Sequence, residues 1–139
     1  MDAKEYLNQA RAINARIEAR KEEITKLEAM LLRGISYEGD GSTKQHNPKG
    51  NEQIIFKIVE LKGMLSHQLM ELVSMQTEIL ATIDKLTEAN EITVLSKRYL
   101  QMKPWSIIQR EMGYSEARVY QIHKMALSHV DDLLNIIVK

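Results

Sequence analysis

Arginine, glutamine and lysine side chains recur near the C-terminal end of the chain with the spacing of one helix face. Arg118, Gln121 and Lys124 follow one another at three-residue steps, and residues three or four apart lie on the same side of a helix. Arginine pairs with guanine through two hydrogen bonds, and glutamine pairs with adenine in the same way. Lysine is better suited to phosphate, a contact that positions a protein without reading sequence. The spacing predicts a helix face that can contact double-stranded DNA.

A glycine precedes this face at the place where a helix-turn-helix motif has its turn. Gly113 tolerates the positive φ that such a turn requires. Counted from it, the packing positions of the motif lie five before, one before, one after, six after and nine after. Apolar or aromatic residues stand at all of them: Ile108, Met112, Tyr114, Val119 and Ile122. We therefore predict a helix-turn-helix between Pro104 and Leu127.

The ends of the two predicted helices carry suitable residues. Pro104 suits the start of the first helix. Ser115 suits the N-cap of the second, and Glu116 follows where the helix dipole favours a negative charge. One position departs from the motif, because Gln109 stands four residues before Gly113, where a small residue is usual. We expect the local crossing of the helices to differ for that reason.

Basic residues outnumber acidic ones in this region, although the chain carries 19 Lys and Arg against 19 Asp and Glu. Residues 97–124 hold six basic and two acidic residues, a local net charge of +4. A basic patch on a neutral chain is what a sited contact with DNA phosphates needs. We expect Arg118 and Gln121 to read bases. The full predicted DNA-binding set is Lys103, Arg110, Ser115, Ala117, Arg118, Tyr120, Gln121 and Lys124.

The same region resembles a known family, the ArpU-type phage transcriptional regulators, which are similar to region 4 of bacterial sigma factors. The resemblance lies in Lys97-Arg98-Tyr99-Leu100, Trp105, Ile108, Met112-Gly113-Tyr114-Ser115, Val119-Tyr120-Gln121-Ile122-His123 and Ala126-Leu127. It implies a phage or prophage regulator of transcription in a bacterial host, with DNA contact through the helix after Ser115. The motif-bearing part covers about a quarter of the chain, and Gln109 departs from its pattern.

Two long amphipathic helices precede the motif. Apolar residues alternate at steps of three and four over residues 2–33 and 51–90, which is the periodicity of a helix with one buried face. The intervening segment, residues 34–50, is rich in Gly and is predicted to be a flexible loop. A second apolar stripe on the later helix predicts a further packing partner: Ile55, Val59, Leu69, Val73, Leu80 and Ile83. That partner is either the C-terminal module or another copy of the chain in a homodimer.

These elements predict an all-α protein, in which a long antiparallel, coiled-coil-like helical hairpin is followed by a small helix-turn-helix domain. The predicted domains are residues 1–90, the hairpin with its flexible loop 34–50, and residues 91–139, the DNA-binding domain. No apolar run approaches the length of a membrane span, about 18 residues, and the first residues lack the apolar core of a signal peptide. We expect a cytoplasmic protein without a membrane partner.

The composition argues against catalysis and against bound metal. Cys is absent, and the four histidines show no pair at a four-residue step, so a zinc site lacks its ligands. No nucleophile, base and orienting residue stand out together in the sequence. We expect no enzyme activity, no metal and no cofactor.

Two other functions fit the same sequence. The chain could be a protein-interaction module whose helix-turn-helix docks on RNA polymerase, with the second apolar stripe as a binding surface. It could also be a phage DNA-packaging protein similar to a terminase small subunit, which joins a DNA-binding helical unit to oligomerisation helices.

Overall fold

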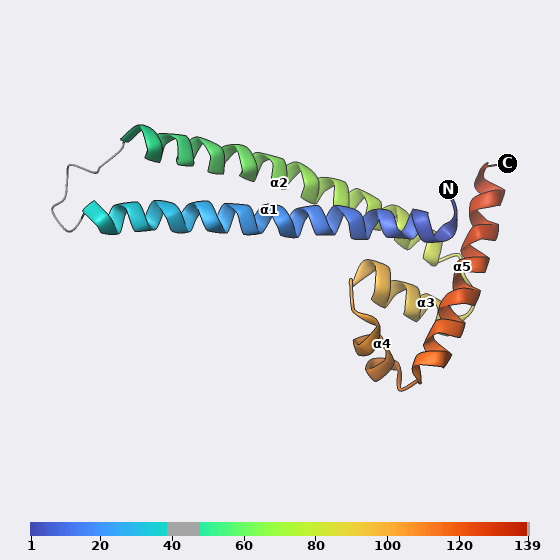
Figure 1. The fold of residues 1–139 in the computed structure, drawn as a ribbon. Helices are drawn as coiled ribbons and strands as arrows, with labels where there is room; N and C mark the ends of the chain where they lie inside the picture. Colours follow the sequence, from blue (N-terminus) through green and yellow to red (C-terminus); the bar gives the residue numbers. More distant parts are fainter. Residues whose placement is uncertain (39–47, 139) are drawn as a thin grey trace. The chain divides into compact units, whose positions relative to one another are not determined.

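The computed structural model describes residues 1–38 and 48–138, and every regular element in that part of the chain is a helix (Figure 1). The prediction of an all-α protein is confirmed. In chain order the elements are α1 (Ala3–Glu38), α2 (Pro48–Ile83), α3 (Ala89–Leu95), the π-helix η2 (Ser96–Leu100), α4 (Trp105–Met112) and α5 (Glu116–Val138).

The chain forms two compact units, and each long helix contributes to both of them. The first unit joins Met1–Ile13 with Leu72–Lys139, and the second is Asn14–Glu71. Whether residues 91–139 fold as an independent domain stays a prediction.

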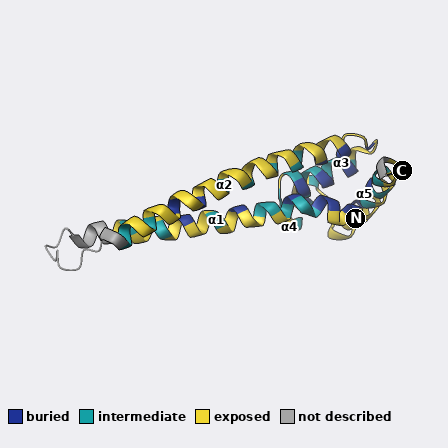
Figure 2. Cartoon of the chain, turned by 90° about the horizontal axis from the view of Figure 1, so that it is seen from above, coloured by how far each residue is buried: buried dark blue, intermediate teal, exposed yellow. Residues whose placement is uncertain are grey.

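The second unit is an antiparallel hairpin of α1 and α2 (Figure 1). Ile24 of α1 packs against Ile58 and Leu61 of α2, and partly buried side chains complete this cluster: Leu27, Leu31, Ile54 and Leu65. All of them belong to the predicted three-four stripes, because that spacing places a side chain on the same face at nearly every turn. Much of the rest of this part of α2 is exposed (Figure 2).

The core of the first unit gathers residues from α1, α2, α3, η2 and α5. Its buried members include Leu7, Ala10, Ile79, Ile83, Leu95, Tyr99, Ala126 and Val130. Thr82 interrupts the apolar stripe of α2, and its Oγ1 lies 3.0 Å from Tyr6 Oη in a buried hydrogen bond. The backbone N–H of Ala3 donates to Asp131 Oδ1 over 2.6 Å, so a carboxylate of α5 caps the start of α1.

The predicted ends of the second long helix and of the last helix were wrong. The second long helix ends at Ile83 rather than at residue 90, and the N–H groups of Lys85 and Leu86 turn back to the carbonyls of Thr82 and Ile83. The apolar stripe gave no sign of this turn, because Leu86 continues the stripe. Leu86 is buried, although it lies outside any helix. The last helix extends to Val138, past Leu127, since its buried face continues through Val130.

The predicted loop 34–50 is helical at both ends. Residues 34–38 belong to α1, and residues 48–50 belong to α2. The middle of the predicted loop, residues 39–47, lies outside the described residues.

Candidate nucleic-acid interface

Gly113 forms the turn between α4 and α5, as predicted. Its φ of 71° and ψ of 27° place it in the left-handed region, which costs glycine nothing because it has no Cβ. The N–H groups of Gly113 and Tyr114 both donate to the carbonyl of Gln109, over 2.9 and 3.2 Å. The bond from Tyr114 closes the six-residue turn of a Schellman motif, which ends α4 and satisfies the carbonyl of Gln109.

Ser115 is the N-cap of α5. Its Oγ accepts the backbone N–H of Arg118 at 3.2 Å, the bond from the third residue of the helix that defines this cap. The start of the candidate DNA-binding helix is therefore set by the serine that the sequence indicated.

The packing positions counted from Gly113 are filled as predicted, with one exception. Ile108, Val119 and Ile122 are buried, and Met112 is partly buried. Tyr114 is 37% exposed, and its Oη accepts a hydrogen bond from Asn90 Nδ2 of α3 over 3.4 Å. Its position beside the turn, predicted for packing, instead carries a ring on the protein surface.

The predicted DNA-contacting residues of α5 share one exposed face. Ala117, Arg118, Tyr120, Gln121 and Lys124 are all exposed, while Val119, Ile122, His123 and Ala126 are buried on the opposite face. On α4, Arg110 is exposed as well. The helix therefore presents the predicted set outward along at least two turns, beside a cap residue, Ser115, that is also exposed.

Arg118 has two neighbours on this face. Its Nη1 donates to Gln121 Oε1 over 3.2 Å, and its guanidinium carbon lies 5.8 Å from the centre of the Tyr114 ring. Both contacts orient a long side chain that would otherwise sample many conformations, and the second falls within the range of a cation–π interaction.

Lys103, predicted to contact phosphate, is paired within the protein. Its Nζ lies 2.7 and 2.8 Å from the two carboxylate oxygens of Glu111, and Lys97 Nζ lies 2.8 Å from Glu111 Oε1. The hydrogen bonds from these two lysines, those of Lys103 first, lower the pKa of Glu111 to about 2. The carboxylate is therefore charged at any ordinary pH and offsets part of the local positive charge.

An aromatic cluster behind the exposed face connects η2, α4 and α5. The Trp105 ring meets His123 edge-on with centroids 4.7 Å apart, and Tyr120 lies 5.3 Å away. Arg98 covers Trp105 at 4.5 Å from the ring centre and donates from Nη1 to the carbonyl of Lys103 at 3.1 Å. Burial, followed by repulsion from Arg11, lowers the pKa of Arg98. Trp105 itself is partly buried.

His123 is the buried member of this cluster. Its Nε2 lies 2.8 Å from Tyr99 Oη. Burial lowers the pKa of His123 to about 4, and the charges of Arg98 and Lys4 act in the same direction. A neutral imidazole therefore packs inside the unit at neutral pH and is unavailable to a phosphate.

A family model described as "Protein of unknown function (DUF1492)" matches residues 40–131, more than half of the chain. The chain belongs to the DUF1492 family. Every residue of the predicted DNA-binding set lies within the matched range, which also includes α3, η2 and α4, whereas α1 precedes it. No curated protein and no solved structure matches the chain.

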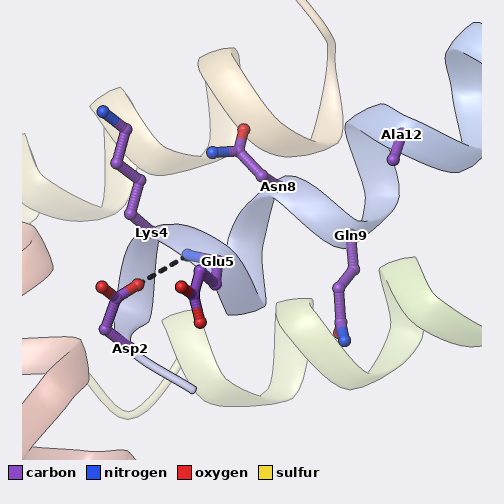
Figure 3. A pocket seen from close by; sticks show the side chains of 6 residues that line it. All are labelled: Asp2, Lys4, Glu5, Asn8, Gln9 and Ala12. Carbon is purple, nitrogen blue, oxygen red and sulfur yellow. Dashed lines mark hydrogen bonds between the residues drawn. The ribbon is translucent and has the colours of Figure 1, made fainter.

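This DUF1492 protein also has a shallow hollow along the first turns of α1 (Figure 3). Its lining residues come from α1 and from the residue just before it: Asp2, Lys4, Glu5, Asn8, Gln9 and Ala12. Asp2 Oδ1 accepts the backbone N–H of Glu5 at 2.8 Å and so serves the helix end rather than a ligand. Across residues 1–38 and 48–138, no three His, Asp or Glu side chains stand together as a metal site, and no helix is long and apolar enough to cross a membrane.

Proposed function

We propose that this DUF1492 protein is a sequence-specific regulator of transcription that binds double-stranded DNA. The observation that carries the proposal is the exposed face of α5, where Arg118, Gln121 and Lys124 lie directly after a glycine turn capped by Ser115. A helix placed after such a turn is the element that enters the major groove in helix-turn-helix proteins.

The residues divide by the chemistry of their side chains. Arg118 and Gln121 have the hydrogen-bonding groups that distinguish base pairs in the major groove. Lys124, Ser115, Tyr120, Arg110 and Lys103 would bind the phosphate backbone, which positions the helix. Ala117, small and exposed at the start of α5, allows the helix close to the base edges.

The biological setting of the proposal comes from the resemblance of residues 97–127 to the ArpU-type phage regulators and to sigma factor region 4. We infer that the protein acts in the cytoplasm of a bacterial host, on a promoter of phage or prophage origin. The fold adds a compatible arrangement, since α4, Gly113 and α5 have the helix-turn-helix order that this resemblance implies.

The test is a selection of bound duplexes from a random pool at two salt concentrations. An enriched motif is expected, with affinity that falls steeply as salt rises because bound phosphates release their counterions. Arg118→Ala should relax the base preference, and Lys124→Ala should weaken binding to all sequences alike. Lys26→Ala, at an exposed lysine of the hairpin, is the control and should leave binding unchanged. Equal losses for Arg118→Ala and Lys124→Ala on specific and random duplexes would contradict these roles.

A second function, protein interaction, has an observation of its own. Large apolar side chains are exposed along α2: Ile55, Phe56, Val59, Leu69, Met70, Val73 and Leu80. A row of large exposed apolar side chains on one helix favours a protein partner, and RNA polymerase or a second copy of the chain would cover it. A homodimer would place two copies of α5 on two half-sites at fixed spacing.

Two measurements separate these partners. Retention of RNA polymerase from a nuclease-treated bacterial lysate would support direct docking. Sedimentation that shows only monomer at high micromolar concentration would exclude the homodimer.

A further inference from the structure

Arg118 is held in place before any ligand arrives. Its backbone N–H is bound by Ser115 Oγ, its Nη1 by Gln121 Oε1 at 3.2 Å, and its guanidinium lies over the Tyr114 ring. That ring is itself fixed from α3, because Asn90 Nδ2 donates to Tyr114 Oη over 3.4 Å. The side chain is therefore restrained from its backbone to its tip.

These restraints leave free the edge of the guanidinium that can recognise a base. Arginine carries five N–H donors in a planar fork, and the contact with Gln121 uses Nη1 alone. No hydrogen bond among the described residues uses the edge formed by Nε and Nη2. That edge presents two parallel donors, and guanine presents two acceptors, O6 and N7, in the major groove.

The amide oxygen of Gln121, unlike the free edge of Arg118, already makes a hydrogen bond. An independent glutamine reads adenine with both ends of its amide, since the oxygen accepts from N6 and the nitrogen donates to N7. In this protein the oxygen already accepts from Arg118. One of the two lone pairs of that oxygen is therefore engaged by Arg118, and a glutamine held in this way orients the arginine instead of turning its whole amide to an adenine.

We propose that Arg118 and Gln121 form one reading unit for a single guanine, in which Arg118 contacts the base and Gln121 is a positioning residue. This inference rests on the proposed DNA-binding function and replaces two independent base readers with one. Fixing a side chain in its bound conformation lowers the entropy lost on binding, so the arrangement sharpens the preference for guanine.

The experiment is the duplex selection repeated with variants of Gln121. Gln121→Met keeps the length of the side chain and removes the acceptor, so it should lower the guanine preference about 2- to 10-fold, the loss expected when one side chain must be ordered on binding. Arg118→Ala should lower it about 5- to 150-fold, the range of a good bidentate pair. Both effects should fall on the same base pair of the motif.

Gln121→Glu is the matched variant, because it keeps an acceptor for Arg118. It should retain the guanine preference while weakening binding to every duplex, since a new negative charge faces the phosphates. The double variant Arg118→Ala/Gln121→Met should lose no more preference than Arg118→Ala alone. Both side chains are exposed, so none of these changes removes a core contact.

The outcomes separate the two proposals. If the wild-type protein enriches no motif, the DNA-reading function fails and the inference fails with it. If a motif is enriched but Gln121→Met relaxes an adenine at a second base pair and leaves the guanine intact, only the inference is wrong.

Discussion

Tyr99 Oη and His123 Nε2 form a buried hydrogen bond of 2.8 Å that joins η2 to α5. Their rings stack with centroids 5.8 Å apart, and Tyr99 is only 2% exposed. His123 lies on the buried side of α5, between Ile122 on that side and Lys124 on the exposed side. The pair therefore anchors the helix whose outer face carries the proposed DNA contacts.

Tyr99→Phe should destabilise the protein by about 1–3 kcal/mol, because it leaves His123 Nε2 buried without this partner. Urea unfolding measures the change in the free energy of unfolding. Tyr120→Phe is the matched control, since it removes the same hydroxyl from an exposed ring on α5, one turn before His123. It should change stability by less than about 0.5 kcal/mol. Equal effects of the two substitutions would show that the buried hydrogen bond contributes nothing.

The lowered pKa of His123 predicts that stability falls as the pH drops below neutral. The unfolded histidine binds a proton near its ordinary pKa of 6.5, whereas the folded one binds it only near pH 4. Between these values the unfolded state holds more protons, so stability increases with pH across this window. The full effect is up to about 3 kcal/mol, and urea unfolding between pH 4 and 8 measures it.

The stability contributed by His129 should change with pH in the opposite direction, which makes His129 an internal control. Its Nδ1 lies 2.6 Å from Glu91 Oε1, and this hydrogen bond raises the pKa of His129. Its contribution is present below pH 6.5 and is lost as the pH rises through the raised value. His129→Gln should therefore remove a decline on the alkaline side and leave the acidic decline of His123 unchanged. An acidic decline that disappears with His129→Gln would refute the assignment to His123.

The helix-turn-helix could be predicted from sequence because its determinants are local. A turn with φ of 71° needs glycine, and the buried residues Ile108, Val119 and Ile122 lie at fixed offsets from it. The stripes of the hairpin are local in the same sense. A helical period of 3.6 places Ile24 on the apolar face of α1 and Ile58 on the apolar face of α2, whatever packs against them.

The other features could not be predicted, because they depend on contacts between residues far apart in the sequence or on ion pairs that a count of charges leaves out. Tyr99 and His123 are 24 residues apart, and Glu91 and His129 are 38 apart. No spacing rule connects such pairs. The count of six basic residues near the motif treats Lys103 as free, although Glu111 in the last turn of α4 pairs with it. The turn after Ile83 escaped prediction because it has neither Gly nor Pro.

The same substitution at two glycines should have opposite effects on stability. At Gly113, with φ of 71°, Gly113→Ala forces a side chain into the left-handed region, which costs roughly 1–2 kcal/mol. At Gly63, a helical position of α2, Gly63→Ala should stabilise by about 0.5–1 kcal/mol. A Cβ added at either position meets no heavy atom within 4 Å, so backbone conformation alone decides the sign. Thermal unfolding of both variants checks it, and two changes of the same sign would contradict the argument.

Glu111→Gln should strengthen binding to DNA. The carboxylate of Glu111 pairs with both Lys97 and Lys103, and with a pKa of about 2 it cannot release them by taking up a proton near neutral pH. Removing its charge frees two lysines for phosphates, and each added phosphate contact steepens the dependence of log affinity on log salt by about 0.9. Anisotropy titrations at several salt concentrations would show a slope steeper by about one to two.

The fold should tolerate this change, because exposed ion pairs contribute little to stability. Glu60→Gln is the control, since Glu60 also pairs with a lysine, Lys57, at 3.5 Å and its loss changes the net charge equally. It lies on α2 and should leave the salt dependence unaltered, whereas adding Lys103→Ala to Glu111→Gln should cancel part of the gain. An equal gain from Glu60→Gln would mean that net charge, and not the position of Lys97 and Lys103 beside the helix-turn-helix, governs the affinity.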